Sequence, residues 1–295
     1  MFSGFDQLEV EANGIRLNLR KGGEGPPLLL LHGYPQTHVM WHLVAPRLAE
    51  QFTVICPDLR GYGDSEKPLM EEGFEAYAKR TMALDMVSLM AELGHERYSL
   101  AGHDRGARVS YRLALDHPER VEKLCIMDIV PTIEQYEQAA DRRVALAMYH
   151  WFFLAQPSPL PETLIASDPE FFLRYSMSGW AKDLNVFHPE AMAEYIRCFS
   201  NPETIRASCD CYRAGARLDC QIDLESREAG DRIKCPTLII WGDRDGKWDE
   251  RGILGTWRRW AENVIGQGVP GGHFCPEEAP EETLELMLGF FGAPA

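Results

Sequence analysis

The chain has 295 residues, of which 45% are hydrophobic, and a formal net charge of −15. It is long enough to bury a large core, and its charge, with no block of Lys and Arg, argues against nucleic acid or an anionic membrane as a partner. No apolar run of about 18 residues occurs, and residues 1–11 lack the basic and apolar segments of an export signal, so we expect a cytoplasmic protein without a membrane span. The eight cysteines form no CxxC pair, which predicts reduced thiols and no metal site.

Short apolar or alternating segments predict the strands. Polar and apolar side chains alternate around Asn13-Gly14, which favours a hairpin at a sheet edge, whereas continuous apolar runs are typical of parallel strands buried on both faces. Strands are expected at residues 8–19 (as a hairpin), 27–31, 52–56, 98–101, 124–127 and 237–241, and helices at 74–93 and 107–115. This alternation predicts an α/β fold with a mostly parallel sheet and helices on both faces.

Residues 131–230 differ from the rest of the chain in composition and in the spacing of apolar residues. They are rich in aromatic residues, Arg and Glu, show helical spacing in several pieces and contain no convincing buried strand. We therefore expect a core domain of residues 1–130 and 231–295 and a helical cap domain of residues 131–230. Such a cap would cover the strand ends, where open α/β sheets bind ligands.

The segment Gly102-His103-Asp104-Arg105-Gly106 lies between a predicted strand and a predicted helix. Glycines on both sides of Asp104 permit the tight turn of a nucleophile elbow, which raises one side chain above the sheet. A carboxylate is ionised at neutral pH and suits displacement of a leaving group from saturated carbon, which leaves an alkyl ester on the enzyme. Asp104 is therefore the candidate nucleophile.

Cleavage of such an ester by water needs a general base, an acid that orients it and an oxyanion hole. His273 follows two glycines near the C-terminus and is the candidate base. Two acids are possible, because Asp128 follows the strand after the elbow and Asp245 follows the next strand. We expect His32 and His103 to be structural, and His38, His42, His95, His117 and His188 to lie at the surface or to cap helices.

Arg105 and Arg108 are three residues apart at the start of the predicted helix, so both can lie on one face beside Asp104. Two guanidinium groups there would bind a short carboxylate and hold its α-carbon against the nucleophile. The alternative is that both are surface residues paired with Asp116 or Glu119. The glycine-containing loop 58–65 lacks the GxGxxG spacing of a dinucleotide site, and we expect no cofactor.

Four motifs in this order resemble the α/β-hydrolase fold over nearly the whole chain: residues 32–35 (HGYP), 58–65 (DLRGYGDS), the Asp104 elbow and 271–274 (GGHF). Residues 102–108 (GHDRGAR), 127–131 (MDIVP) and 149–151 (YHW) further resemble the fluoroacetate dehalogenases, which convert fluoroacetate to glycolate and fluoride without a cofactor. The resemblance implies that Asp128 is the acid, that a small anionic haloacid is the substrate and that the protein is a homodimer.

The same resemblance implies roles for the other site residues. It assigns halide binding to His150, Trp151 and Tyr212, and a pocket-lining position to Trp180. The backbone N–H groups of Tyr34 and Arg105 would form the oxyanion hole. Without the resemblance, aromatic residues in a helical cap are more often plain core.

Two other functions remain open. An epoxide hydrolase would use the same nucleophile, base and acid, with Tyr149 or Tyr212 as proton donor, although paired arginines argue against a neutral epoxide. A non-catalytic binding protein could keep the fold and lose the machinery, but the nucleophile, base and acid are all in place here.

Overall fold

A computed structural model describes residues 1–70, 72–181, 183–243 and 250–293. In these residues one eight-stranded sheet has the order β1-β2-β4-β3-β5-β6-β7-β8; β2 pairs antiparallel with both β1 and β4, and the other pairs are parallel. The strands are β1 (Phe5–Ala12), β2 (Ile15–Gly22), β3 (Pro27–Leu31), β4 (Thr53–Pro57), β5 (Tyr98–His103), β6 (Val121–Met127), β7 (Thr237–Gly242) and β8 (Val264–Val269). The predicted α/β fold is confirmed.

The central strands are buried on both faces, as their continuous apolar sequences predict. All six residues of β5 are buried, and the four leucines of β3 are fully buried. The predicted hairpin forms the β1–β2 edge, with Ala12 paired to Ile15. Strand β8 was not predicted; its residues alternate between exposed and half-buried because it lies at the other edge of the sheet.

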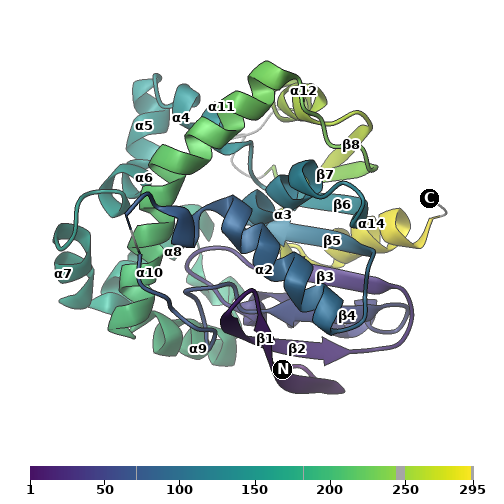
Figure 1. The fold of residues 1–295 in the computed structure, drawn as a ribbon. Coiled ribbons are helices and arrows are strands. Elements are labelled where there is room, and N and C mark those ends of the chain that lie inside the picture. The colour runs from purple at the N-terminus through teal and green to yellow at the C-terminus, as the bar shows by residue number, and fades with distance from the viewer. Residues whose placement is uncertain (71, 182, 244–249, 294–295) are drawn as a thin grey trace.

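Helices cover both faces of the sheet. Helices α2 and α3 pack side by side on the face nearer the viewer, and α14 lies behind the strands (Figure 1). The helical segments outside the cap are η1 (His38–Trp41), α1 (Ala45–Leu48), η2 (Glu75–Tyr77), α2 (Lys79–Glu92), α3 (Asp104–Asp116), α12 (Glu250–Trp260), α13 (Cys275–Glu278) and α14 (Pro280–Gly292).

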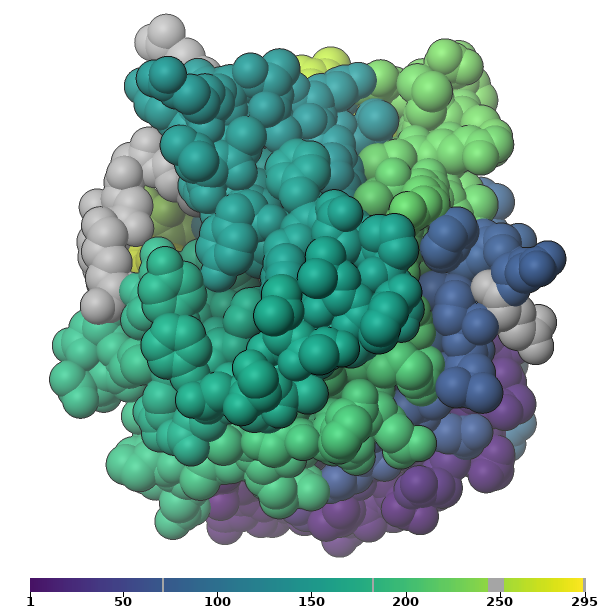
Figure 2. All heavy atoms as spheres, turned by 90° about the vertical axis from the view of Figure 1, so that its left-hand side faces the viewer, coloured from purple at the N-terminus to yellow at the C-terminus, as the bar shows by residue number. Residues whose placement is uncertain are grey.

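The described residues between β6 and β7 form helices and no strand. They gather at one end of the sheet (Figure 1) and make up most of the face shown in Figure 2. Their bounds are α4 (Thr132–Gln138), α5 (Arg142–Ala147), α6 (Tyr149–Leu154), α7 (Leu160–Ala166), α8 (Pro169–Ala181), η3 (Leu184–Val186), α9 (Pro189–Phe199), α10 (Pro202–Ala214), the π-helical η4 (Gly215–Asp219) and α11 (Cys220–Ala229). Among the described helices, none is both long and apolar enough to cross a membrane.

Candidate active site

Asp104 stands at the sharp turn between β5 and α3. Its φ angle is +45°, in the left-handed region that ordinary residues rarely adopt, so the surrounding structure must hold it there. A side chain at Gly106 would meet the carbonyl oxygens of Leu31 and His32, and one at Gly102 would meet Ser110. Gly102 therefore lets α3 pack closely on β5, and Gly106 lets it pack closely on the end of β3, as the elbow prediction requires. Helix α3 begins at Asp104, three residues earlier than predicted.

The backbone N–H of Tyr34 donates a hydrogen bond of 2.9 Å to Asp104 Oδ1. Tyr34 lies in the loop after β3, at the same end of the sheet as the elbow. The second proposed oxyanion donor, the N–H of Arg105, is in the first turn of α3, where backbone N–H groups have no carbonyl partner within the helix. The two N–H groups thus come from two separate segments that meet at Asp104.

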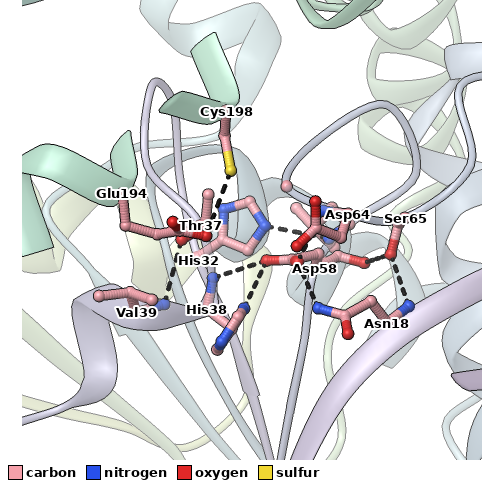
Figure 3. Close-up of polar contacts among 12 residues, drawn as sticks. Asn18, His32, Thr37, His38, Val39, Asp58, Asp64, Ser65, Glu194 and Cys198 are labelled. Atoms are coloured by element: carbon pink, nitrogen blue, oxygen red, sulfur yellow. Dashed lines mark hydrogen bonds and ion pairs between the residues drawn. The ribbon is translucent and has the colours of Figure 1, made fainter. Parts of the chain in front are cut away.

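Asp58 binds His38, which follows Tyr34 by four residues, and several other polar groups (Figure 3). Its Oδ1 accepts hydrogen bonds from the backbone N–H of His38 at 2.9 Å and from His38 Nδ1 at 2.8 Å. Its Oδ2 accepts from Asn18 Nδ2 at 2.7 Å and from the backbone N–H of Asp64 at 3.0 Å. Burial alone would raise the pKa of Asp58, but His38 beside it holds that pKa below its usual range. Asp58 is therefore ionised, and from the start of the predicted loop 58–65 its carboxylate binds His38, Asn18 and Asp64.

His273 Nδ1 lies 2.7 Å from Asp128 Oδ2, and His273 Nε2 lies 4.0 Å from Asp104 Oδ2. Asp128 follows β6, has a φ of +54° and accepts a second hydrogen bond from the N–H of Gly242 at 3.2 Å. The predicted nucleophile, base and acid therefore lie together. The alternative acid, Asp245, lies outside the described residues.

Two contacts hold the loop that carries His273. His103 Nε2 lies 2.7 Å from the His273 carbonyl oxygen, so this ring nitrogen is the donor, and burial lowers the pKa of His103 to about 3 and keeps the ring neutral. The backbone N–H of His273 donates to the carbonyl oxygen of Trp180, at the end of α8, at 3.5 Å. The base is thus supported by the elbow strand below and by a helix between β6 and β7 above.

Arg105 and Arg108 are both 1% exposed, so the alternative of two surface arginines is wrong. Asp116, which that alternative made their partner, instead binds Arg80 and Arg112. Burial alone would raise the pKa of Asp104, but the charge of Arg105 and then of His273 lowers it below the usual range of a carboxyl group. Asp104 is therefore ionised.

The guanidinium groups of the two arginines lie against aromatic rings. The Arg105 Cζ is 3.4 Å from the centre of the Tyr212 ring and 4.6 Å from that of Trp151, and the Arg108 Cζ is 4.4 Å from Trp151. No described residue accepts a hydrogen bond from Arg105 Nε, Nη1 or Nη2. Arg108 Nη1 donates to the carbonyl oxygen of Val130 and to Thr132 Oγ1. Burial and the Arg105 cation lower the pKa of Arg108. Both groups thus favour an added anion.

The other predicted site residues form an aromatic cluster near the base. The His150 ring is 4.7 Å from Trp180 and 6.0 Å from Tyr212, and the Trp151 ring is 5.9 Å from Tyr212. Trp180 is half-buried and lies 5.8 Å from the His273 ring. Side chains from α6, α8 and α10 therefore meet beside the catalytic candidates, although they are far apart in sequence.

Several supporting residues of the site have no recognisable signal in the sequence. His38 and His42 are buried rather than at the surface, because His38 bonds Asp58 and His42 Nδ1 bonds the carbonyl oxygen of Val39. His188 caps α9, as predicted. Buried Glu277 was also missed, since nothing in the run of acidic residues at 277–282 separates it from its exposed neighbours.

Comparisons with known proteins agree with this architecture. A family profile described as alpha/beta hydrolase fold matches residues 26–280. A fluoroacetate dehalogenase from Burkholderia sp. is 41% identical over 98% of this chain and 95% of its own length. A soluble epoxide hydrolase from Corynebacterium sp. (strain C12) is 40% identical over 95% of this chain and 94% of its own length.

Solved structures give the same answer. A structure from Nostoc sp. PCC 7120 superposes with a TM-score of 0.96 at 52% identity and covers 100% of both chains. A mutant of a candidate epoxide hydrolase from Pseudomonas aeruginosa, solved with bound MFA, has a TM-score of 0.93 at 43% identity and covers 99% of this chain and 97% of its own. The chain therefore belongs to the α/β-hydrolase family.

Proposed function

We propose that this hydrolase is a haloacetate dehalogenase, which converts fluoroacetate to glycolate and fluoride through an ester on Asp104. One observation carries the proposal: beside an ionised Asp104, the buried Arg105 guanidinium has no hydrogen-bond acceptor among the described residues. A buried guanidinium with unsatisfied donors is costly even beside a carboxylate, and a substrate carboxylate would supply the missing acceptor. A neutral substrate would leave that cost in place.

The first step is an in-line displacement. Arg105 and Arg108 bind the carboxylate of fluoroacetate, and Asp104 Oδ2 attacks the α-carbon. The new bond joins this oxygen to carbon, the C–F bond breaks, and fluoride leaves with the bonding electron pair. The Tyr34 N–H binds the other oxygen, Oδ1, at 2.9 Å and thereby fixes the direction of attack.

In the second step His273 takes a proton from water, which attacks the carbonyl carbon of the Asp104 ester. Asp128 orients the ring through the 2.7 Å contact to Nδ1 and stabilises the imidazolium that forms. The backbone N–H groups of Tyr34 and Arg105 would bind the oxyanion. Collapse of this intermediate breaks the ester bond, and the His273 imidazolium returns its proton to the departing glycolate oxygen. The regenerated carboxyl group of Asp104 then loses its proton, which restores the carboxylate.

We propose that His150, Trp151 and Tyr212 bind the departing fluoride. Fluoride is strongly hydrated, so a site that releases it needs several hydrogen-bond donors in place of water. Burial raises the pKa of Tyr212, which keeps its hydroxyl protonated and able to donate. The short ring distances between the three side chains support a common role.

Epoxide hydrolysis is the second candidate, because a soluble epoxide hydrolase is 40% identical over 95% of this chain. The same Asp104 would open the ring, and the protonated Tyr212 could donate to the epoxide oxygen. The arginines distinguish the two proposals, since a neutral epoxide offers no partner to Arg105.

The deciding experiment measures fluoride and chloride release from fluoroacetate and chloroacetate by the wild type and by Asp104→Asn. Release of fluoride that is lost in the variant supports the proposal. Release of chloride alone would indicate a broader haloacid dehalogenase, and turnover of styrene oxide without halide release would replace the proposal by epoxide hydrolysis. Multiple turnover in ¹⁸O water should label Asp104, and an unlabelled Asp104 would contradict the ester.

A further inference from the structure

Glu277 is a buried carboxyl group at the junction of three segments of the site. It belongs to α13, four residues after His273, and its side chain is 0% exposed. Gln36 Nε2 donates a short hydrogen bond to its Oε2, and the hydroxyl of Tyr195 donates to its Oε1 at 2.9 Å. Gln36 is two residues from Tyr34, and Tyr195 is on α9. Glu277 therefore connects the segment that carries the base His273, the loop after β3 that carries Tyr34 (the oxyanion loop) and helix α9.

The Gln36 end of this connection leads directly to Asp104. The backbone N–H of Gln36 donates to the carbonyl oxygen of Gly33 at 2.9 Å, which closes the turn that contains Tyr34. The N–H of Tyr34 in turn binds Asp104 Oδ1. A shift of the Gln36 side chain would therefore move the N–H group that faces the nucleophile.

No Lys or Arg among the described residues forms an ion pair with Glu277. The nearest basic group is His42 Nδ1 at 3.9 Å, and burial lowers the pKa of His42, so this ring is neutral. Glu278 on the same short helix is a like charge, and His188 lies behind His42 at 6.0 Å between ring centres. On the α9 side the facing group is Tyr195, with Glu194 beside it. Burial, together with the like charge of Glu278, favours the neutral carboxylic acid and outweighs the hydrogen bonds from Tyr195 and Gln36, which favour the carboxylate.

The neutral acid also suits the hydrogen-bond inventory of this cluster. Gln36 Oε1 is buried and has no donor among the described residues. A protonated Glu277 has an O–H to give. With the amide oxygen and nitrogen of Gln36 exchanged, that oxygen would accept the O–H in place of the hydrogen bond from Nε2. An ionised Glu277 has no proton to offer.

We propose that Glu277 is a positioning residue, which as a neutral acid ties Gln36 to Tyr195 and so holds the Tyr34 N–H against Asp104. This inference rests on the proposed function, because its main consequence is for the rate of ester formation and hydrolysis. Ionisation of Glu277 would place an uncompensated charge at this junction and loosen the oxyanion loop. Burial raises the pKa of Glu277 to about 8, so ionisation falls within an accessible pH range.

The first test compares chloride release from chloroacetate across pH in the wild type, Glu277→Gln and Glu277→Leu. Glutamine keeps the shape and neutrality of the acid, so it should match the wild type below neutral pH and keep its kcat above about pH 8, where the wild type declines. Leucine removes both hydrogen bonds and should lower kcat at every pH by up to about a hundredfold, with KM unchanged, because the arginines are untouched. Glu281→Gln, at an exposed position, is the matched control and should behave as the wild type.

The second test does not depend on activity. Hydrogen exchange of residues 33–42, corrected for the intrinsic pH dependence, should show protection that the wild type loses above about pH 8 and Glu277→Gln keeps. If the wild type and Glu277→Gln have the same kcat profile and the same exchange profile at alkaline pH, the inference is wrong. This outcome does not depend on whether Glu277→Leu folds. If no protein releases halide while the exchange difference is present, the proposed function fails and the positioning role stands.

Discussion

Asp128 Oδ2 lies 2.7 Å from His273 Nδ1, which leaves Nε2 as the ring nitrogen that faces Asp104. Asparagine at position 128 could present its amide N–H to Nδ1 and so favour the tautomer that protonates Nε2. We therefore expect Asp128→Asn to slow ester hydrolysis by roughly 10³- to 10⁴-fold. Mass spectrometry of the peptide containing Asp104 should then show an accumulated ester, and Asp245→Asn should not accumulate one. The reverse result would assign the acid to Asp245.

Removal of the Arg105 charge should separate stability from activity. Arg105 is buried without a hydrogen-bond acceptor among the described residues, but its charge stabilises the ionised Asp104, so Arg105→Met removes both unsatisfied donors and a counter-charge. These two effects oppose each other, so we expect unfolding in urea to show no strong loss of stability in the variant. Acetate at about 100 times its Kd should stabilise the wild type by about 2.7 kcal/mol and leave the variant unchanged. A strongly destabilised variant would make Arg105 a structural residue instead.

The Tyr212 hydroxyl should matter more for fluoride than for chloride. Tyr212→Phe keeps the ring that stacks on Arg105 at 3.4 Å and removes only the donor. Loss of one preorganised donor costs about 10²-fold in kcat when the leaving atom needs it, and chloride is less strongly hydrated than fluoride. Parallel assays with fluoroacetate and chloroacetate measure this ratio. Tyr149→Phe, at a ring that is 40% exposed, is the control and should change neither rate. Equal losses for the two halides would remove Tyr212 from halide binding.

The sequence predicts the central sheet well because burial on both faces produces uninterrupted apolar runs. Strand β3 matches the predicted residues 27–31, and β5 extends the predicted 98–101 by two residues. Strand β8 has no apolar run to indicate it, because two of its six residues are exposed and two are glycine. The predicted start of the elbow helix lies three residues too far along the chain, because Asp104 and Arg105 are polar in sequence but buried in the structure.

For the site, short sequence motifs identify the residues that carry out the chemistry but do not identify the residues that hold them in place. The elbow, its two arginines and the histidine after two glycines are short motifs, so the sequence reveals them. His38 and Asn18 lie 20 and 40 positions from Asp58, and Tyr195 and Gln36 lie 82 and 241 positions from Glu277. No pattern in one sequence indicates such contacts, and for that reason His38 and His42 were expected at the surface.

Gly215 should control the position of Arg105. It begins the π-helical turn η4, and a Cβ atom there would lie 3.2 Å from Arg105 Nη1. We expect Gly215→Ala to displace the guanidinium and to raise the KM for chloroacetate by about tenfold. Gly179→Ala, in α8, is the matched control because its Cβ would meet no atom within 4 Å. That change should leave KM unaltered and could stabilise the helix by about 1 kcal/mol. An unchanged KM in Gly215→Ala would show that the added methyl group does not displace the Arg105 guanidinium.

Glu277 should make folding stability depend on pH in a direction that its surroundings fix. Burial raises its pKa from an ordinary value of 4.5 to about 8 in the folded protein. The folded state therefore holds this proton more tightly than the unfolded state, so the contribution to stability is complete below about pH 4.5, shrinks as pH rises and is gone above about pH 8. Glutamine does not titrate. The unfolding free energy of the wild type minus that of Glu277→Gln should thus fall through this range and level off above it.

Urea unfolding at a series of pH values measures that difference directly. Glu281→Gln provides the comparison for an exposed carboxyl group, whose replacement should leave no such trend. If the difference in unfolding free energy between the wild type and Glu277→Gln stays constant with pH, Glu277 is ionised in the folded protein across this pH range. The proposal of a neutral acid would then be wrong. A difference that falls as expected, together with the matching decline in kcat, would tie the stability of this junction to the geometry around Asp104.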